Sequence, residues 1–313
     1  MPRQTTSTLL MISPVGFRMN EQTAVNNYYQ KVLDGLSPEK VNEAAIQEFD
    51  RFVSVLESKG ISVISIQDTA NPDTPDSIFP NNWVSFHHDG RVALYPMFAE
   101  NRRLERREDI FDDLKNHYGF EINEIIDFTE FEDHNKYLEG TGSMILDRYN
   151  RIAYAAISER TDRRAFELFC EVFDYVGVVF EAFQSVGDER KLIYHTNVMM
   201  CIANHFAIVC LDAIDDAEER EMVSQTIRDS GKEIISISEE QTQRFAGNML
   251  EVANSEGKSY LVMSTSAFEA LNTEQKERIE KHSEIIHSSL DTIEACGGGS
   301  ARCMMAEVFL PKI

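Results

Sequence analysis

The feature that most constrains the fold of this chain is a unit that recurs along it. Helical patterns begin near residues 41, 101, 162, 216 and 273, and in the clearest of them, residues 41–60, the apolar side chains share one face. Each pattern is followed by a short apolar stretch that we expect to be a strand: ISVISI, NEIIDF, YVGVVF, KEIISI and SEIIHSS. The repetition predicts a fold assembled from five similar units.

A strand pair accompanies each helical pattern. Four pairs are contiguous and resemble hairpins, with turns at Asp89-Gly90, Tyr149-Asn150, Asn204 and Glu256-Gly257. The fifth pair is divided between residues 7–15 and 302–311, and pairing these ends would close the repeat into a ring. We therefore expect an α/β fold, a five-bladed α/β propeller, in a single domain over residues 1–313. A doubly wound sheet explains the alternation of strands and helices but not the strand pairs.

Composition limits the classes of partner. The 313 residues include 53 acidic and 30 basic side chains, and the net charge of −23 would repel nucleic acid and anionic membranes. No apolar run approaches the ~18 residues of a membrane span. Five cysteines without a CxxC pair predict neither a disulfide framework nor a zinc site, and they favour a cytoplasmic location. Composition leaves the oligomeric state open, a homodimer included.

The repeat also predicts where reactive side chains meet. Residues just before each hairpin should gather at one end of the ring's axis, and these positions hold Asn81 and Asn82, then Glu139, then His195 and Asn197, then Asn248, and finally Cys303. Taken singly, a Cys, a His or a Glu is more often structural than catalytic. Their occurrence at one phase of the repeat favours a reactive site.

The residue types indicate nucleophilic catalysis. Three glycines precede Cys303 and permit a close approach of the backbone to a ligand. A thiolate is the nucleophile in such sites, and a neighbouring imidazolium lowers the pKa of a thiol. We expect His195 to play this part and to act as acid and base, with Glu139 orienting the imidazole.

Three motifs resemble a known superfamily. LEGTGS (residues 138–143), YHTN (194–197) and GGGSARCM (297–304) are similar to the acidic, histidine and nucleophile segments of the guanidino-group-modifying (pentein) superfamily. That superfamily contains arginine and agmatine deiminases, amidinotransferases and dimethylarginine dimethylaminohydrolases. The resemblance covers essentially the whole chain. It implies the five-bladed propeller and a reaction that needs neither a metal nor an organic cofactor.

The resemblance also implies a small-molecule amino-acid substrate. Asp76 matches a residue near the substrate's α-amino group, and Arg102 matches an arginine that grips the α-carboxylate, although a difference of one residue in length leaves Arg103 open. Arg160 matches a second substrate arginine. A planar guanidinium suits this task because it pairs a carboxylate through two hydrogen bonds.

The stretch FPNNWVSF departs from the superfamily pattern. Asn81 and Asn82 stand where the dimethylarginine hydrolases have two acids, and Asn197 stands where deiminases have an aspartate. A guanidinium would lose charge-assisted hydrogen bonds worth roughly 1.5–3 kcal/mol each, whereas a neutral ureido group suits an amide. The chain therefore looks like the citrulline-utilisation hydrolases. In this interpretation Cys303 attacks the ureido carbon of citrulline and forms a covalent adduct, and the products are ornithine, carbon dioxide and ammonia.

Two other interpretations stay open at this point. The chain is also compatible with an arginine or methylarginine deiminase-type hydrolase or an amidinotransferase, in which Glu132 or Asp133 would reach the guanidinium. The other alternative is a non-catalytic propeller that binds a partner, as in a ribosome-associated branch of the fold. That branch lacks the cysteine, histidine and acid that this chain has together.

Overall fold

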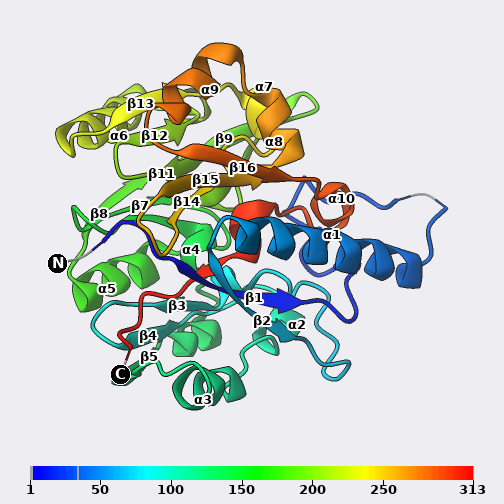
Figure 1. Cartoon of the computed structure of the whole chain (residues 1–313). Coiled ribbons are helices and arrows are strands. Elements are labelled where there is room, and N and C mark those ends of the chain that lie inside the picture. The colour runs from blue at the N-terminus through cyan, green and yellow to red at the C-terminus, as the bar shows by residue number, and fades with distance from the viewer. Residues whose placement is uncertain (1–2, 34, 313) are drawn as a thin grey trace.

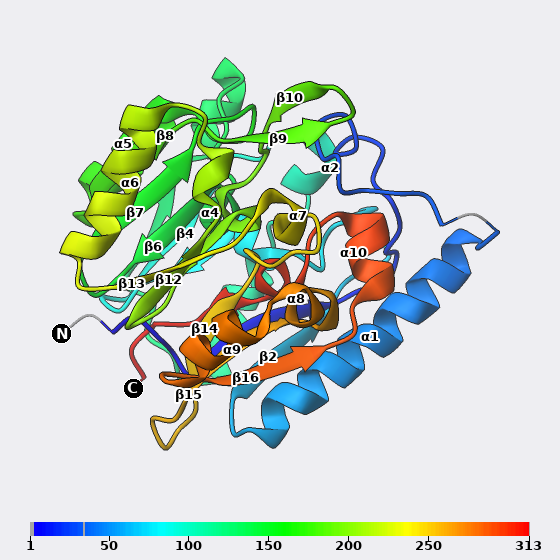
Figure 2. The ribbon, with the colours of Figure 1, turned by 90° about the horizontal axis from the view of Figure 1, so that it is seen from above.

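The strands form five three-stranded sheets and one two-stranded hairpin (Figures 1 and 2). The structure is a computed structural model that describes residues 3–33 and 35–312. In each three-stranded sheet one antiparallel pair is extended by a parallel third strand. The sheets comprise β17 (Ala306–Glu307), β1 (Thr8–Ser13) and β2 (Ser62–Gln67); β3 (Val84–Phe86), β4 (Arg91–Leu94) and β5 (Glu124–Asp127); β6 (Met144–Asp147), β7 (Ile152–Ala156) and β8 (Val176–Phe180); β11 (Met200–Ile202), β12 (Phe206–Val209) and β13 (Glu233–Ser236); and β14 (Leu250–Ala253), β15 (Ser259–Ser264) and β16 (Glu284–Ser288).

A helix precedes the third strand of every sheet, as the repeat predicts. Figures 1 and 2 show these helices at the periphery of the molecule and the sheets inside. The five are α1 (Pro38–Ser58), α3 (Asp109–Asn116), α5 (Arg163–Phe173), α6 (Ala217–Asp229) and α9 (Thr273–Glu280). Shorter helices are α2 (Glu100–Arg103), α4 (Gly140–Ser143), α7 (Glu239–Thr242), α8 (Thr265–Ala270) and α10 (Asp291–Gly297), and the 3₁₀ turns are η1 (Pro80–Asn82), η2 (Thr129–His134), η3 (Thr196–Val198), η4 (Leu211–Ala213) and η5 (Ala301–Met304).

Helix α1 shows why these elements form where the pattern predicts them. Ser37 caps its start by accepting a hydrogen bond from the Lys40 backbone N–H, and Gly60 follows its end at φ +79°. The apolar face is buried, and each such Phe or Leu stabilises the fold by about 1.5–3 kcal/mol. The buried residues of this face are Val41, Ala45, Phe49, Phe52 and Leu56.

The two ends of the chain meet in one sheet. Strand β17 pairs antiparallel with β1, with Leu9 opposite Glu307 and Leu10 opposite Ala306, so the prediction that the fifth strand pair is split between the termini is confirmed. The sequence did not predict the extra hairpin of β9 (Phe183–Val186) and β10 (Glu189–Leu192). None of the helices in the described part of the chain is long and apolar enough to cross a membrane.

Candidate active site

The loops that precede the first strands of the sheets converge. The turn η1 contacts both α4 and η5, and α4 also contacts η3. These four elements contain or adjoin Asn82, Glu139, Asn197 and Cys303, which are separated by up to 221 residues in the chain. All four side chains are buried. The convergence that the repeat predicted is therefore present in the structure.

Glu139 and His195 form a hydrogen-bonded pair. Nε2 of His195 lies 2.7 Å from Oε2 of Glu139, and the Phe98 backbone N–H donates to the other carboxylate oxygen at 2.9 Å. Since a carboxylate only accepts, Nε2 carries the proton. The Nδ1 of a neutral His195 is then an unprotonated base, and this imidazole lines the pocket.

Two guanidinium groups surround the same carboxylate. Nη1 of Arg160 lies 3.6 Å and Nη1 of Arg102 lies 3.9 Å from Oε2 of Glu139. Burial alone would raise the pKa of Glu139, but Arg160, His195 and Arg102 outweigh it and hold that pKa below its usual range. Burial lowers the pKa of His195 to about 4, because the lost hydration of the imidazolium outweighs the attraction of Glu139. The site thus holds an ionised glutamate and a neutral histidine.

The thiol of Cys303 is held by amides rather than by the imidazole. Nδ2 of Asn197 and Nδ2 of Asn248 each lie 3.3 Å from the sulfur. In the part of the chain that the structure describes, no hydrogen bond joins His195 to Cys303. The expectation that an imidazolium lies beside the thiol therefore does not describe this conformation.

The loop that carries Cys303 is anchored from behind. The Cys303 backbone N–H donates to the Ser300 carbonyl at 3.0 Å, and the Ser300 hydroxyl donates to the Glu294 carboxyl group of α10 at 2.5 Å. A β-carbon on Gly297 would lie 2.7 Å from the Phe79 ring. The glycine is therefore required because the loop packs directly on this ring. Burial raises the pKa of Glu294 to about 7.

Asn82 is oriented by Arg102. Nη1 of Arg102 donates to Oδ1 of Asn82 at 2.9 Å, and because a guanidinium has only donors, the amide nitrogen faces away from it. That Nδ2 atom is buried and has no hydrogen-bond partner among the described residues. A β-carbon on Gly142 would lie 2.4 Å from Nδ2 of Asn82 and 2.8 Å from Nδ1 of His195. The absence of a side chain at 142 lets the amide donor and the imidazole approach the same space.

Arg102 is itself held by a buried carboxylate. Its Nε and Nη2 lie 2.8 and 2.9 Å from the two oxygens of Glu105, and both side chains are buried. A third donor reaches the Phe79 carbonyl at 3.3 Å. The guanidinium of Arg102 is thus largely saturated by protein groups, so it fixes Asn82 more directly than it offers a site for a free carboxylate.

The segment from residue 14 to 33, which we call the strap, covers the pocket. Asn20 and Thr23 donate to Oδ2 of Asp76 at 2.8 and 3.2 Å, while Oδ1 of Asp76 has no partner within the described ranges. Oδ1 of Asn26 accepts from Nε of Arg160 at 2.9 Å. Strap side chains therefore hold the groups that the resemblance assigns to a substrate.

The covered pocket is small. It is lined by Asp76, Asn82, Arg160, His195 and Cys303 among others, and the volume open to the centre of a water molecule is only about 10 Å³. Such a space holds about one water molecule. An amino acid can enter only if the strap or the nearby loops move.

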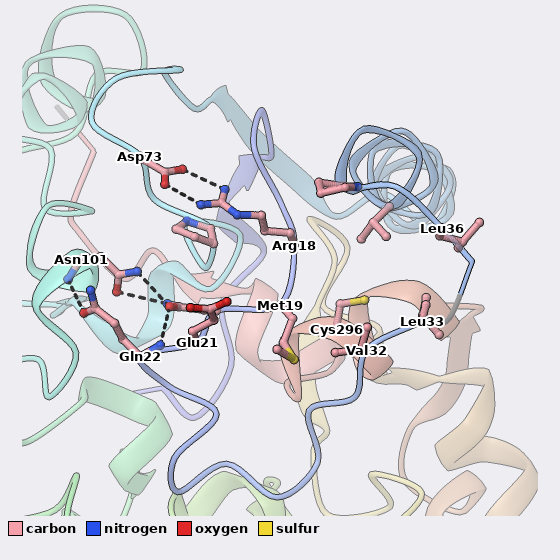
Figure 3. Close-up of a pocket in the computed structure, with 14 residues that line it drawn as sticks. Arg18, Met19, Glu21, Gln22, Val32, Leu33, Leu36, Asp73, Asn101 and Cys296 are labelled. Carbon is pink, nitrogen blue, oxygen red and sulfur yellow. Dashed lines mark hydrogen bonds and ion pairs between the residues drawn. The ribbon is translucent and has the colours of Figure 1, made fainter.

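A larger hollow lies beside the strap (Figure 3). By the same measure its volume is about 510 Å³, and it lies between the strap and the helices α1 and α10. Asn20 and Asn101 exchange two amide hydrogen bonds at its edge, of 2.9 and 3.2 Å. Since Asn20 also donates to Asp76, this amide pair connects the hollow to the covered pocket. The sequence did not predict this hollow.

Three predicted residues lie away from the pocket. The Asn81 side chain donates to Thr141 at 3.3 Å and does not line the pocket, although it is buried. Arg103 points to the Met97 carbonyl and to Glu132. Asp133 is exposed. Of the two arginines that the sequence left open, Arg102 is the one that lines the pocket.

The sequence did not indicate several groups that build the site. Asn20, Thr23 and Asn26 lie on the strap, and Glu105 and Glu294 support Arg102 and the nucleophile loop. One available signal was length, because a connection of more than about 15 residues without helix or strand patterning is often functional. Glu105 and Glu294 carry no such signal, since each looks like an ordinary polar residue of a helix or its flank.

Comparison with known proteins agrees with the resemblance. A family model described as "N,N dimethylarginine dimethylhydrolase, eukaryotic" matches residues 13–310. No protein of curated function matches the chain.

Solved structures share the fold at low sequence identity. ArgZ, an arginine dihydrolase from the ornithine–ammonia cycle in Cyanobacteria, superimposes with a TM-score of 0.73 at 17% identity, over 98% of this chain and 41% of ArgZ. The chain thus spans less than half of ArgZ, but it covers 97% of the separate N-terminal domain of ArgZ with bound substrate, at a TM-score of 0.70 and 17% identity. A dimethylarginine dimethylaminohydrolase adduct with S-methyl-L-thiocitrulline gives 0.63 at 12% identity, over 97% of this chain and 99% of that one. These similarities establish a common α/β fold.

Proposed function

The chain belongs to the family of N,N dimethylarginine dimethylhydrolases, within the guanidino-group-modifying (pentein) superfamily of C–N hydrolases, and from this premise we propose that it hydrolyses the ureido group of citrulline. One observation carries the choice of substrate. Nδ2 of Asn82 is buried, has no partner among the described residues and can only donate, because Arg102 occupies the oxygen of the same amide.

The donor distinguishes a ureido group from a guanidinium. A guanidinium presents N–H donors alone, so it would leave Nδ2 of Asn82 facing another donor, and an unsatisfied buried group costs about 1–3 kcal/mol. The carbonyl oxygen of a ureido group accepts the Asn82 hydrogen bond. Glu132 and Asp133, which would have served a guanidinium, do not line the pocket.

The reaction follows from the geometry of the thiol and the imidazole. The Cys303 thiolate attacks the ureido carbon, forming a C–S bond while the carbonyl electron pair moves to oxygen, where Asn82 stabilises the charge. Collapse expels the terminal nitrogen as ammonia, with a proton delivered by His195. His195 then takes a proton from water, which breaks the C–S bond and restores the thiol. The resulting carbamate loses carbon dioxide to give ornithine, so each citrulline consumes one water and releases one ammonia.

The remaining groups are assigned to the α-carbon of the substrate. Oδ1 of Asp76 is a buried acceptor without a partner in the described chain, which suits an α-ammonium group. Arg160 suits the α-carboxylate once Asn26, which now accepts from Nε and Nη2, moves away. Arg102, being paired with Glu105, orients Asn82 instead of gripping the carboxylate.

We further propose that residues 1–313 form one domain, a closed five-bladed α/β propeller. Contacts of β17 with β3, of β6 with β11, and of β11 with β14 support this arrangement, as does the pairing of β1 with β17. The five cysteines are free and buried, which fits the reducing conditions of a cytoplasmic location.

Arginine is the second candidate substrate. The fold neighbours include arginine dihydrolases, one of them a binary complex of AgrE with L-arginine. Conversion of arginine to ornithine through citrulline releases two ammonia molecules, whereas citrulline releases one. The ratio of ammonia to ornithine therefore separates the two substrates.

The test is a product assay on the purified chain. Citrulline, arginine and an Nω-methylated arginine are supplied separately, and ornithine, citrulline and ammonia are quantified, with Cys303→Ala as the blank. We expect ornithine and ammonia in equal amounts from citrulline and no product from arginine. Formation of citrulline from arginine would overturn the choice of substrate, and identical results with Cys303→Ala would overturn the nucleophile.

A further inference from the structure

The Asn248 side chain occupies a position that the reaction above does not explain. It lies two residues before β14, as Asn82 lies two residues before β3, and it is fully buried. Its Nδ2 atom lies 3.3 Å from the sulfur of Cys303 and 3.1 Å from the Asn197 carbonyl.

The orientation of this amide is set by the nucleophile loop. The Arg302 backbone N–H donates to Oδ1 of Asn248 at 3.0 Å. Since a backbone N–H can only donate, Oδ1 must face it, and the two N–H groups of Asn248 are left for the Asn197 carbonyl and the sulfur. The thiol sulfur also lies 3.8 Å from Oδ1, so the closer contact is the one that a thiolate would accept.

A glycine makes the position possible. A β-carbon on Gly247 would lie 2.3 Å from the Val198 carbonyl oxygen and 2.6 Å from the Met199 carbonyl carbon. Both obstacles are backbone atoms, which do not yield as a side chain does. Gly247 thus lets the loop before β14 lie directly on η3, and this brings Asn248 and Asn197 to the same sulfur.

We propose that Asn248 is a catalytic residue which, with Asn197, stabilises the Cys303 thiolate through two carboxamide N–H···S hydrogen bonds. This inference rests on the proposed nucleophile. It assigns to neutral amides the task that an imidazolium performs in many cysteine enzymes. The asparagine at 197 gains a second reason here, because an aspartate there would present an anion to the thiolate instead of a donor.

Other charged and titratable groups face this sulfur and are common to all the variants below. They are Arg302 on the same turn, Tyr194 and His195 before η3, Arg102 on α2, and Asp76 and Arg160 on the pocket wall. Arg302 bonds the Met305 carbonyl and Glu307, and Arg102 bonds Glu105. Neither guanidinium therefore acts on the sulfur alone, and a difference between wild type and an Asn248 variant reports the amide.

The experiment measures the rate of iodoacetamide labelling of Cys303 against pH, read by mass spectrometry on the folded protein. Asn248→Asp keeps an oxygen for the Arg302 N–H but replaces the donor on the sulfur by an anion. We expect the pH midpoint of labelling to rise by about one to two units, as expected for a charge-assisted hydrogen bond. We also expect kcat for the substrate to fall at least tenfold, with little change in KM.

A matched control lies in the same hairpin. Asn254 accepts from the Glu256 and Lys258 backbone N–H groups in the turn after β14, so Asn254→Ala weakens the hairpin without touching the pocket. An unshifted midpoint in Asn248→Asp, or an equal shift in Asn254→Ala, would overturn the inference. If wild-type Cys303 labels no faster than the other four cysteines, the proposed nucleophile fails instead, which is a separate result.

Discussion

Replacing Asn82 with aspartate changes the one atom on which the choice of substrate depends. One oxygen of the introduced carboxylate would keep the contact that Arg102 now makes at 2.9 Å, and the other would stand in place of Nδ2. The variant thus exchanges a donor for an anion with almost no change in volume.

The magnitude follows from two effects on the reaction with citrulline. Removing one donor from a developing oxyanion lowers kcat by about 100- to 1000-fold, or about 2.7–4 kcal/mol. The new carboxylate also repels the oxyanion, by about 4 kcal/mol at 4 Å with an effective dielectric constant near 20, and Arg102 offsets part of this. We expect a loss of about 1000-fold or more in kcat with citrulline.

With arginine the same variant should gain activity. A guanidinium would find a charge-assisted acceptor worth about 1.5–3 kcal/mol, which corresponds to roughly 10- to 150-fold in kcat/KM. The assay compares citrulline and arginine side by side for wild type and Asn82→Asp, with ammonia and ornithine quantified.

Asn81→Asp is the matched control for this prediction. Asn81 is the neighbouring residue and equally buried, but its amide contacts Thr141 and not the pocket. A citrulline activity of Asn82→Asp within threefold of wild type would refute the reasoning. An equal loss in both variants would also refute it, because a general effect on folding would then explain the result.

Further predictions concern the supporting groups. Because burial holds the pKa of His195 at about 4 and the reaction needs the neutral imidazole, kcat/KM should stay constant from about pH 7 down to about pH 5; a fall centred near pH 6.5 would contradict this. Glu294 has a pKa of about 7 in the folded protein, above its usual 4.5, so its contribution to the free energy of unfolding is fully present below about pH 4.5 and is lost as pH rises through about 7. Urea unfolding of Glu294→Gln, which stays neutral, should lack this decline, on the order of 3 kcal/mol; parallel pH profiles would contradict the assignment. Gly142→Ala should lower kcat at least 100-fold, since its β-carbon would displace Asn82 and His195, whereas Gly16→Ala, with no contact closer than 3.8 Å, should be neutral in the same assay. Glu139→Gln should abolish most activity and lower the free energy of unfolding by about 3–5 kcal/mol, because the charge of Arg160 loses its nearest carboxylate; an unchanged melting temperature would argue against it.

The fold was largely readable from local patterns. Helix α1 shows the 3.6-residue period of its buried face, and the turns at Asp89-Gly90 and Glu256-Gly257 separate strand pairs where expected. These signals are local, because an amphipathic face and a turn depend on residues only a few positions apart. The strap has no such period, and its position over the pocket depends on contacts with Asp76 and Arg160 that no local pattern encodes.

The sequence by itself determined the repeat, the pairing of the chain ends and the convergence of Glu139, His195 and Cys303, because equivalent positions of a repeated unit fall at equivalent places in space. Only the tertiary structure decided which atom each group presents. Arg102 takes the oxygen of Asn82 and leaves its nitrogen as a donor, and the sulfur of Cys303 meets two amides rather than the imidazole. The physical reason is that an asparagine side chain carries a donor and an acceptor on one rigid plane. The direction in which each points is set by neighbours from other parts of the chain.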